Sequence, residues 1–590
     1  MKKILLPISL LFFVVILING QNFKHFIAPT VTYLDNVKLK VKILPGDTVC
    51  IQAGTRRSLK FVNVHGTLEN PVIVINYGGE VIIQGVDIRW GIAFNNCSFM
   101  HFTGTGSPEI KYGFKILKTM EGGTSGVSGD GKSTNIEIDH FEIANVGFAG
   151  IFYKSDPVCD LSANRGNFIQ YQTLIHDNYI HNTGGEGLYI GHSFYNGYNK
   201  TCDGQTVTLY PSTLSGVRIY NNVIDSTGWD GMQVGSATED CEIYNNKVTN
   251  YAIDKISMQN VGIQLGGGTT GKCYNNEILD GNGNGIAVFG NGDIDIYNNL
   301  IVNPGKDYWV EDKSRPAHGI FIDNGSTIPG TYFNVFNNTI VSPKTDGIRF
   351  QNNISVNNNF HNNIIVNPGS LLDYLRIPAK NPWINLNKAN IVITKSNNLF
   401  EVNIDSIHFV DPANFNYKLY GNSPAIDNGF DVSSLGLNYD LDYNLRPQGS
   451  AYDIGAYEYV SDSISMQNTN SAQLVNKNIP NIENLNSAAN LIKNNVNNKL
   501  KLKTVNVLNP ITDFDIFPNP SNGQFRFKRN NESIVNISIY DVMGNIVYRE
   551  NNIKDLEKEI DISSKLEKGK YFITINNTNN KTTKSIIINR

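Results

Sequence analysis

Ile219-Tyr220-Asn221-Asn222 is followed by Asp230-Gly231-Met232-Gln233-Val234, in which Gly231 lies nine residues after Asn222. Both strings recur along the chain at a spacing of a few tens of residues. The first string returns, as Ile/Val-Tyr/Phe-Asn-Asn, at 243–246, 296–299 and 335–338. The second returns around the glycines at 187, 285, 319 and 347. Self-similarity at such a period predicts a solenoid of stacked coils.

Each string is short, rich in Ile and Val and apolar at alternate positions, which predicts one β-strand. The shortest coil, from Gly262 to Gly285, has 23 residues. At about 3.3 Å per residue, that length leaves room for three short strands and three bends. We therefore predict an all-β protein in which 35–460 forms a cylinder of parallel strands with three faces. The Asn-Asn pairs are expected to stack as a polar ladder at one bend, because asparagine tolerates left-handed backbone.

The bulk composition limits the classes of function. The chain has 590 residues, with 49 basic and 53 acidic side chains and a formal charge of −4. A nucleic-acid groove or a polybasic membrane patch is therefore not expected. Lys2, Lys3 and an apolar run over 4–18 predict a secretory signal peptide over 1–20. Nothing else in the sequence predicts a transmembrane segment in the mature chain.

The six cysteines suit an exported protein, in which disulfides can form. Cys159 and Cys202 fall in the two longest insertions of the repeat, so we predict a bridge between them. Cys241 and Cys273 fall at inward positions of adjacent coils, two residues out of register, and are expected to be buried thiols. No Cys/His spacing in the chain suggests zinc, so no metal site is predicted.

The repeat fades toward the C-terminus, and the composition then changes twice. From about 397 to 460 we expect a cap on the solenoid, which as a domain spans 21–460. The segment 461–512 contains 14 asparagines and no aromatic residue, which predicts a flexible linker. The last segment, 513–590, has alternating strand patterns and turn residues that predict a small β-sandwich.

The last domain carries four motifs in order: Phe517-Pro-Asn-Pro-Ser-Asn-Gly523, Tyr540-Asp-Val-Met-Gly544, Leu566-Glu-Lys-Gly-Lys-Tyr571 and a closing Lys584-Ser-Ile-Ile-Ile588. It resembles the type A C-terminal sorting domain of type IX secretion, found in Bacteroidota. The resemblance implies export across both membranes by the type IX machinery, removal of the domain, and release or surface attachment. The alternative for this segment is a carbohydrate-binding sandwich.

The segment 35–460 resembles the right-handed parallel β-helix superfamily. This superfamily includes polysaccharide lyases, glycoside hydrolases and epimerases, and it also includes adhesins, so the fold alone does not give the function. The residue before each aligned glycine forms a column: Ala149, Glu186, Asp230, Val261, Asn284, His318 and Asp346. Strings such as Trp229-Asp-Gly231 and Thr345-Asp-Gly347 look similar to cleft strings of polygalacturonase-type hydrolases. The Asp-Asp pair, the Gly-His-Gly and the Arg-Ile-Lys of those enzymes are missing, so the resemblance implies only where the cleft lies.

Strict alternation would place each glycine, and the residues two and four positions later, on the outer surface. The glycines would then leave an open floor that a chain-like ligand could approach closely. Acids, amides and aromatic rings beside that floor suit sugar hydroxyls and pyranose faces. The residues predicted to contact a polysaccharide are Tyr189, Trp229, Gln233, Gln264, His318 and Arg349.

Glu186 and Asp230 occupy equivalent positions on adjacent coils, where strands stack about 4.8 Å apart. When two carboxyls lie at such a short separation, each raises the proton affinity of the other. A general acid at neutral pH requires a raised proton affinity of this kind. We therefore predict Glu186 and Asp230 as the catalytic pair, assisted by His192. The alternative is structural: both acids would cap their own turns, and His192 would be an ordinary loop histidine.

These features favour a secreted or surface-attached enzyme that degrades a polysaccharide, and we predict a glycoside hydrolase that needs no cofactor. One alternative is a polysaccharide lyase acting on a uronic-acid polymer. Its base would come from Lys154, Arg349, Tyr189 or His192, with Glu186 and Asp230 holding a Ca²⁺ ion. A second alternative is a non-catalytic glycan binder or adhesin.

Overall fold

The computed structural model describes residues 23–306, 315–369 and 381–461, together with strands between 514 and 588. It divides into two compact units, Met1–Ala472 and Gln473–Arg590. The predicted signal peptide lies outside the described residues, and so does the predicted linker beyond Ser461. None of the described helices is long and apolar enough to cross a membrane.

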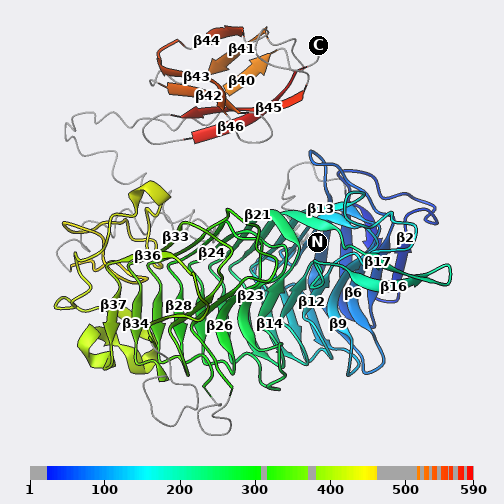
Figure 1. Ribbon diagram of the computed structural model, residues 1–590. Helices are drawn as coiled ribbons and strands as arrows, with labels where there is room; N and C mark the ends of the chain where they lie inside the picture. The colour runs from blue at the N-terminus through cyan, green and yellow to red at the C-terminus, as the bar shows by residue number, and fades with distance from the viewer. Residues whose placement is uncertain are drawn as a thin grey trace, which may run out of the picture. The chain divides into compact units, whose positions relative to one another are not determined.

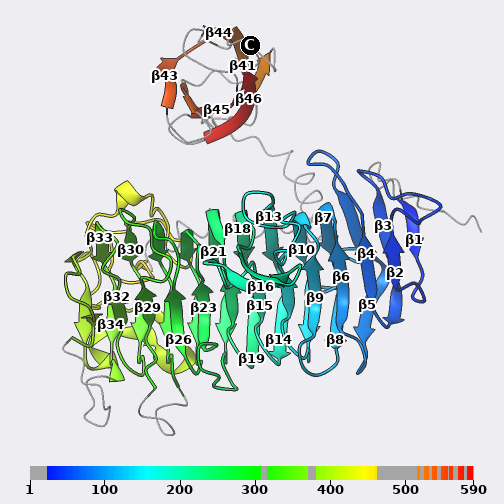
Figure 2. The same cartoon turned by 45° about the vertical axis from the view of Figure 1, so that its right-hand side comes forward.

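The first unit is a right-handed parallel β-helix, as the repeat predicts (Figures 1 and 2). A typical coil runs through β13 (Ile169–His176), β14 (Tyr179–Thr183) and β15 (Leu188–Ile190). Each strand pairs in parallel with its counterpart in the next coil, for example β15 with β20 (Met232–Val234). The three stacks of strands form the three predicted faces, here named face one, face two and face three in the order of this coil.

The other strands of the three faces continue the same stacks. Face one contains β1 (Phe23–Ile27), β3 (Thr48–Arg56), β5 (Val72–Gln84), β7 (Ser98–Thr103), β10 (Thr134–Asp139), β18 (Thr213–Tyr220), β21 (Ala237–Tyr244), β24 (Gly271–Tyr274), β27 (Ile294–Tyr297), β30 (Phe333–Phe336), β33 (Asn358–His361) and β36 (Ile393–Ser396). Face two contains β8 (Phe114–Lys118), β11 (Phe141–Ala144), β19 (Val223–Thr227), β22 (Lys247–Thr249), β25 (Glu277–Leu279), β28 (Leu300–Val302), β31 (Thr339–Val341), β34 (Ile364–Val366) and β37 (Leu399–Glu401), and the second half of β5 joins it. Face three contains β2 (Tyr33–Asp35), β4 (Leu59–Val62), β6 (Trp90–Asn95), β9 (Ser125–Asp130), β12 (Ile151–Tyr153), β23 (Val261–Leu265), β26 (Asn284–Val288), β29 (Ile320–Asp323), β32 (Ile348–Gln351) and β35 (Ile384–Leu386).

Apolar side chains stack in columns inside the coils, one from each turn of the helix. One such column on face one is fully buried and consists of Ile175, Ile219, Ile243, Cys273, Ile296, Val335 and Phe360. Cys241 and Cys273 are buried free thiols, which confirms the prediction for them. Continuous stacking of this kind buries apolar area in every coil and drives the fold.

The predicted asparagine ladder stands at the bend between faces one and two. Each amide donates from Nδ2 to Oδ1 of the next rung over 2.9–3.1 Å. The rungs are Asn178, Asn222, Asn246, Asn276, Asn299, Asn338, Asn363 and Asn398. The asparagine before each rung from Asn222 onward has a positive φ, between 49° and 55°. The first asparagine of each pair therefore makes the left-handed turn, and the second satisfies buried backbone groups.

The aligned glycines, such as Gly187 and Gly231, do not face the side of the coil that was predicted for them. A β-carbon added at Gly187 would lie 2.6 Å from Cγ2 of Ile224 and 2.5 Å from the carbonyl oxygen of Gly231. The glycine therefore faces the interior, and the expected open floor on the outer surface is wrong. The reason is a bend at this position that breaks strict alternation, so that Gly187 and Leu188 both point inward. Tyr189, two residues after the glycine, does lie on the outer side and is half-buried.

The residues after β37, where a cap was expected, pack along the flank of the coils. Their apolar side chains include Ile407, Phe409 and Ala425, and they cover outward residues of face two such as Leu300 and Ile364. The short elements here are η2 (Ile404–Ile407), β38 (Phe409–Asp411), η3 (Pro412–Asn414), β39 (Asn416–Leu419) and η4 (Ser433–Leu435).

The second unit contains two antiparallel sheets. One is formed by β40 (Phe514–Phe517), β41 (Gln524–Arg529) and β44 (Glu557–Asp561). The other is formed by β42 (Val535–Tyr540), β43 (Ile546–Ile553), β45 (Gly569–Asn576) and β46 (Lys581–Ile588). Alternate apolar side chains such as Phe525, Phe527, Ile537 and Ile539 are buried. That these sheets form a sandwich stays a prediction.

Candidate functional site

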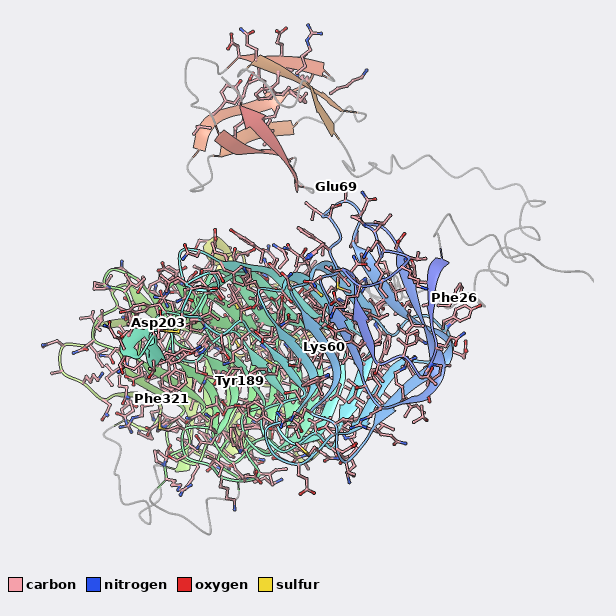
Figure 3. The ribbon with its side chains drawn as sticks, turned by 90° about the vertical axis from the view of Figure 1, so that its right-hand side faces the viewer. Phe26, Lys60, Glu69, Tyr189, Asp203 and Phe321 are labelled. Atoms are coloured by element: carbon pink, nitrogen blue, oxygen red, sulfur yellow. A yellow bond between two sulfur atoms is a disulfide. The ribbon has the colours of Figure 1, made fainter. Side chains whose placement is uncertain are left out.

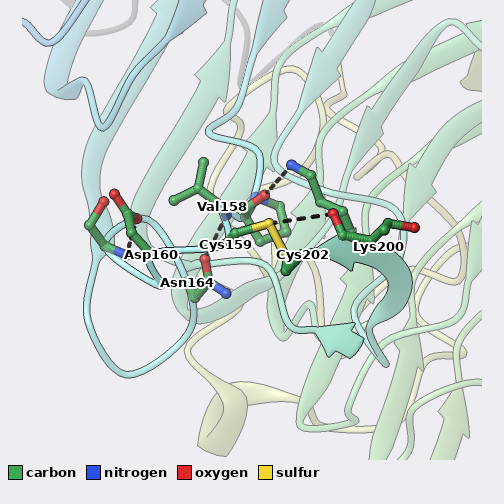
Figure 4. Close-up of a disulfide and its surroundings, with 9 residues drawn as sticks. Val158, Cys159, Asp160, Asn164, Lys200 and Cys202 are labelled. Carbon is green, nitrogen blue, oxygen red and sulfur yellow. Dashed lines mark hydrogen bonds between the residues drawn. A yellow bond between two sulfur atoms is a disulfide. The ribbon is translucent and has the colours of Figure 1, made fainter. Parts of the chain in front are cut away.

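The two longest insertions of the solenoid follow β12 and β15 on face three. The second contains the hairpin β16 (Tyr198–Cys202) and β17 (Gln205–Leu209). Cys159 and Cys202 are disulfide-bonded with a Cα separation of 5.6 Å, which confirms the predicted bridge (Figure 4). Lys200 Nζ also donates to the carbonyl oxygen of Pro157 over 3.2 Å. The insertions are thus tied together as one wall beside face three, and Figure 3 labels Asp203 in the hairpin and Tyr189 on the face.

Glu186 and Asp230 lie at the bend between faces two and three on neighbouring coils, and both are fully buried, with 0% exposure. The Gly187 amide donates to the carbonyl oxygen of Asp230 over 3.1 Å, which fixes the two backbones side by side. Asp230 Oδ1 accepts a hydrogen bond of 2.8 Å from the amide of Val261 in the next coil. Asp230 Oδ2 and both oxygens of Glu186 accept none from another residue. Three of the four carboxyl oxygens are therefore buried without a protein partner, an arrangement that is uncommon in protein interiors.

Burial controls the protonation of this pair. It raises the pKa of Glu186 to about 7. It raises the pKa of Asp230 well above its usual range, and the neighbouring Glu186 charge adds to that shift. Burial and the close approach of the two carboxyls therefore both favour a protonated form of the pair at a pH where exposed carboxyls are ionised.

Aromatic rings gather on the outer side of the same coils. Phe148 and Trp229 immediately precede Ala149 and Asp230, which belong to the column of residues before the aligned glycines, and their ring centroids are 5.4 Å apart. Phe152 and Tyr189 are 5.1 Å apart, and Phe148 joins the two pairs at 6.1 Å from Tyr189. The structure therefore brings together Tyr189 and Trp229, two of the predicted sugar contacts. Flat aromatic faces of this kind suit the apolar faces of sugar rings.

A chain of polar side chains crosses the next coils of face three. Tyr189 Oη bonds with Ser193 Oγ. Gln233 Nε2 donates to the same Ser193 Oγ over 2.8 Å, and Gln264 Nε2 donates to Gln233 Oε1 over 2.6 Å. The predicted contacts Tyr189, Gln233 and Gln264 are thus linked through Ser193. Sequence reasoning missed this serine because it follows the strand in a non-repeating loop.

His192 is nearly buried between the two insertions. Its Nδ1 accepts a hydrogen bond from the amide of Phe194, so its Nε2 carries the proton that faces Asp156 Oδ1 at 3.3 Å. Lys154 Nζ lies 2.6 Å from the same oxygen. His192 and Lys154 hold the pKa of the Asp156 carboxyl well below its usual range. The sequence had suggested Lys154 and His192 but not Asp156, for which the only signal is a Lys-Ser-Asp string directly after β12.

His318 and Arg349 lie several coils further along face three. His318 is buried, with Nδ1 at 3.2 Å from Asp346 Oδ2 and 2.8 Å from Thr345 Oγ1. Arg349 Nη1 lies 3.6 Å from Asp346 Oδ2. Four coil steps separate β15 from β29, or about 19 Å. The structure does not bring these two residues to Glu186, so any contact they make with a ligand requires one that extends along the helix axis.

A hollow of ≈ 260 Å³ opens on face three beyond the polar chain. It is lined by Ser193, Phe194, Tyr195, Gly267, Phe289 and Ser326, among others. The hollow and the aromatic cluster together line one side of the coils from β12 to β29. An elongated ligand could therefore run along the axis from the aromatic rings into this space.

Residues 515–589 match the family model for a secretion system C-terminal sorting domain. The chain carries a sorting domain. This domain indicates export through the type IX system, so the protein is secreted or held at the cell surface. The match accounts for the four C-terminal motifs and covers only the second unit.

No curated protein matches the chain. Among solved structures, pectate lyase Pel9A has 13% identity and a TM-score of 0.40, covering 75% of this chain and 98% of its own. The alginate lyase from Paenibacillus sp. strain FPU-7 has 14% identity and a TM-score of 0.31, covering 52% and 93%. The A-module of the Azotobacter vinelandii mannuronan C-5 epimerase AlgE6 has 12% identity and a TM-score of 0.30, covering 60% and 91%.

Proposed function

We propose that the protein is an exported glycoside hydrolase that binds a polysaccharide along face three and cleaves it at the coils of β15 and β20. The observation that supports this most directly is the Glu186–Asp230 pair, two buried carboxyls with raised pKa values beside an aromatic cluster. Sugar rings would stack on Tyr189 and Trp229, and the amides of Gln233 and Gln264 would bond sugar hydroxyls.

Glycoside cleavage needs one carboxyl that donates a proton and another that acts as a base or nucleophile. Burial raises the pKa of both carboxyls, and the charge of Glu186 raises that of Asp230 further, so the pair favours holding a proton. We assign the protonated Asp230 as the donor to the leaving oxygen and Glu186 as the base or nucleophile, because an ionised Glu186 favours the protonated form of Asp230. Backbones about 4.8 Å apart favour the short carboxyl separation of retaining enzymes, which is about 5–5.5 Å.

Both carboxyls are closed to solvent, so a substrate reaches them only if side chains above them move. Trp229 is a candidate, because it precedes Asp230 in the chain and packs edge-on against Phe148. We expect glycan binding to change the fluorescence of Trp229. A Trp229→Phe variant identifies which tryptophan gives the signal.

The test is the release of reducing ends from a panel of polysaccharides. We expect Glu186→Gln and Asp230→Asn each to lower turnover by about 100-fold or more, because each removes a proton-transfer group. Glu239→Gln, which changes an exposed carboxylate on face one, is the matched control and should leave turnover unchanged. Circular dichroism checks that each variant is folded. Near wild-type turnover in both pair variants would contradict the assignment.

A second candidate function is a polysaccharide lyase, because three of its candidate groups converge in the structure. Lys154 lies over the Phe152 and Tyr189 rings, at 5.3 and 5.7 Å, and meets His192 through Asp156. Lys154 thus places a cation beside Tyr189, a candidate base, as elimination from a uronate requires. The Ca²⁺ role considered for Glu186 and Asp230 does not fit, because Ca²⁺ needs six to eight oxygen ligands and this buried pair offers few.

The same panel separates the candidates. A lyase creates a conjugated double bond that absorbs in the ultraviolet, and a hydrolase releases reducing ends without that absorbance. Loss of the ultraviolet signal in Lys154→Met or His192→Gln, with activity kept in Glu186→Gln, would favour the lyase. Saturable binding without either product would indicate a glycan-binding protein.

A further inference from the structure

A cluster of histidine and carboxylate side chains lies on face one, a different side of the coils from the proposed glycan site. His101 comes from β7, Glu137 and Asp139 come from β10, and His176 comes from β13. In the strand register Glu137 pairs with His101, and Asp139 pairs with His176. Because alternate residues of a strand point to the same side, three neighbouring coils present these four side chains on one patch.

The nitrogen and oxygen atoms of the cluster converge. His101 Nε2 and one oxygen each of Glu137 and Asp139 lie within 4.8 Å of one another. His101 Nε2 contacts Asp139 Oδ2 and lies 3.8 Å from Glu137 Oε1. His176 Nε2 approaches the same carboxylates at 3.0 and 3.8 Å. Ligand atoms about 2.1 Å from a tetrahedral Zn²⁺ ion lie about 3.4 Å apart, so these separations need only small shifts.

A second layer of hydrogen bonds fixes the orientation of these groups. The other ring nitrogen of His176, Nδ1, is 2.8 Å from Asp177 Oδ2. Thr103 Oγ1 donates to Asp139 Oδ1 over 2.6 Å, and His140 Nδ1 lies 2.6 Å from the same oxygen. A histidine that ligates a metal usually donates its second N–H to a carboxylate or carbonyl, as His176 does to Asp177.

The charge of the patch favours a cation. Three carboxylates, those of Glu137, Asp139 and Asp177, face the histidines. Within the part of the chain that the structure describes, none of these three forms an ion pair with a lysine or an arginine. The side chains that contact these three carboxylates as ion-pair partners are therefore histidines, whose ring nitrogens are also metal ligands.

We propose that His101, Glu137, Asp139 and His176 bind a divalent transition-metal ion, with Zn²⁺ as the best fit. Two imidazole nitrogens and two carboxylate oxygens are a donor set suited to Zn²⁺, whereas Ca²⁺ prefers oxygen ligands throughout. A bound ion ties the coils of β7, β10 and β13 together across face one. The site is independent of the proposed glycan cleavage, because its residues lie on another sheet.

The short motif spacing of a zinc finger is absent, which is why the sequence predicted no metal. The ligands come from successive coils, 38 residues apart for His101 and Asp139 and 39 for Glu137 and His176. Only the strand register brings them together.

The test is titration of the metal-stripped full chain with Zn²⁺ alone, followed by calorimetry. We expect one ion per chain, a raised thermal midpoint, and a visible absorption band from a tetrahedral Co²⁺ substitute. His101→Ala removes a partly exposed ligand and should lower affinity by at least about 100-fold. Asp177→Asn removes the partner of His176 and should lower it by about 10- to 100-fold.

His181→Ala is the matched control, because it removes a histidine of the same coil from face two and should leave Zn²⁺ affinity unchanged. Asp139→Asn could impair folding, since Asp139 also accepts bonds from Thr103, so His101→Ala is the deciding variant. Absence of saturable Zn²⁺ binding would overturn the proposal. Equal affinity of the wild-type chain and the His101→Ala variant would overturn it as well.

Discussion

Glu186 is a carboxylic acid without access to water, and that single fact makes the stability of the solenoid depend on pH. Its pKa rises from 4.5 to about 7 on folding. Between these values the unfolded chain is ionised and the folded chain is protonated, so folding takes up a proton. The free energy of unfolding therefore falls as the pH rises from about 4.5 to about 7, by roughly 3 kcal/mol from this group.

Replacing Glu186 by Gln removes this contribution. We expect the free energy of unfolding of Glu186→Gln, relative to the wild type, to increase between pH 5 and pH 8. Denaturant titrations at the two pH values measure it. The free energy of unfolding of the Glu239→Gln variant, which changes an exposed residue, should equal that of the wild type at both pH values. A constant difference between Glu186→Gln and the wild type would show that Glu186 does not titrate in this range.

The residues of the site were only partly predictable from sequence. The pairing of Glu186 with Asp230 follows from the repeat, because the same position recurs in each coil. The group of Lys154, Asp156 and His192 does not, because its contacts join two non-repeating insertions. Alternation also misplaced the glycine column, since strand periodicity says nothing about the direction of a side chain at a bend.

At the scale of elements, the asparagine ladder gives a direct test. Asn276 donates to Asn299 Oδ1 and accepts from both the amide and Nδ2 of Asn246. Asn276→Ala leaves several buried groups without partners and should destabilise the solenoid by about 3 kcal/mol or more. Thermal or denaturant unfolding measures the change.

Asn275 is the control, because it adjoins Asn276 and has a different role. Its φ of 53° is a conformation that glycine adopts freely. Asn275→Gly should therefore change stability by less than about 1 kcal/mol. Equal losses in the two variants would show that the ladder hydrogen bonds are not what stabilises this bend.

The disulfide between the two insertions should protect the hairpin from proteolysis. Cys159 and Cys202 tie the hairpin of β16 and β17 to the insertion after β12. A double Cys→Ser variant should be cut by trypsin at Lys200 faster than the wild type, because the hairpin loses its tether. The unfolding midpoint of the solenoid should change little, since both cysteines lie outside the stacked core. An unchanged rate of proteolysis would show that hydrogen bonds between the two insertions hold the hairpin in place without the disulfide.

On the scale of the whole molecule, the flanking segment and the sorting domain should behave differently on truncation. A chain ending at Val460 loses the second unit and residues 461–472 of the first, and should keep the thermal transition of the solenoid. A chain ending at Val402 also loses the segment that covers Leu300, Val302 and Ile364, and should melt lower or aggregate. Calorimetry of both chains measures this, and a large loss in the longer chain would contradict the independence of the units.

The whole-molecule architecture was the most predictable level. The repeat period implies coils, and the coil length implies three strands, because both are properties of the backbone. The flank packing of 404–459 was not predictable, since no repeat there indicates which face it covers. The metal cluster proposed on face one was missed for the same reason, because its contacts depend on the register between coils.

The asparagine ladder also gives the coils from Asn178 to Asn398 the same connection at this bend. Successive rungs are separated by 23 to 44 residues, yet each gives its amide hydrogen to the next over 2.9–3.1 Å, always in one direction. The geometry of this hydrogen bond therefore does not depend on the number of residues between two successive asparagines. We therefore expect that in-frame duplication or deletion in the gene can add or remove whole coils. Each added coil would bring its own asparagine, which forms the same hydrogen bonds with the asparagines of the coils on either side.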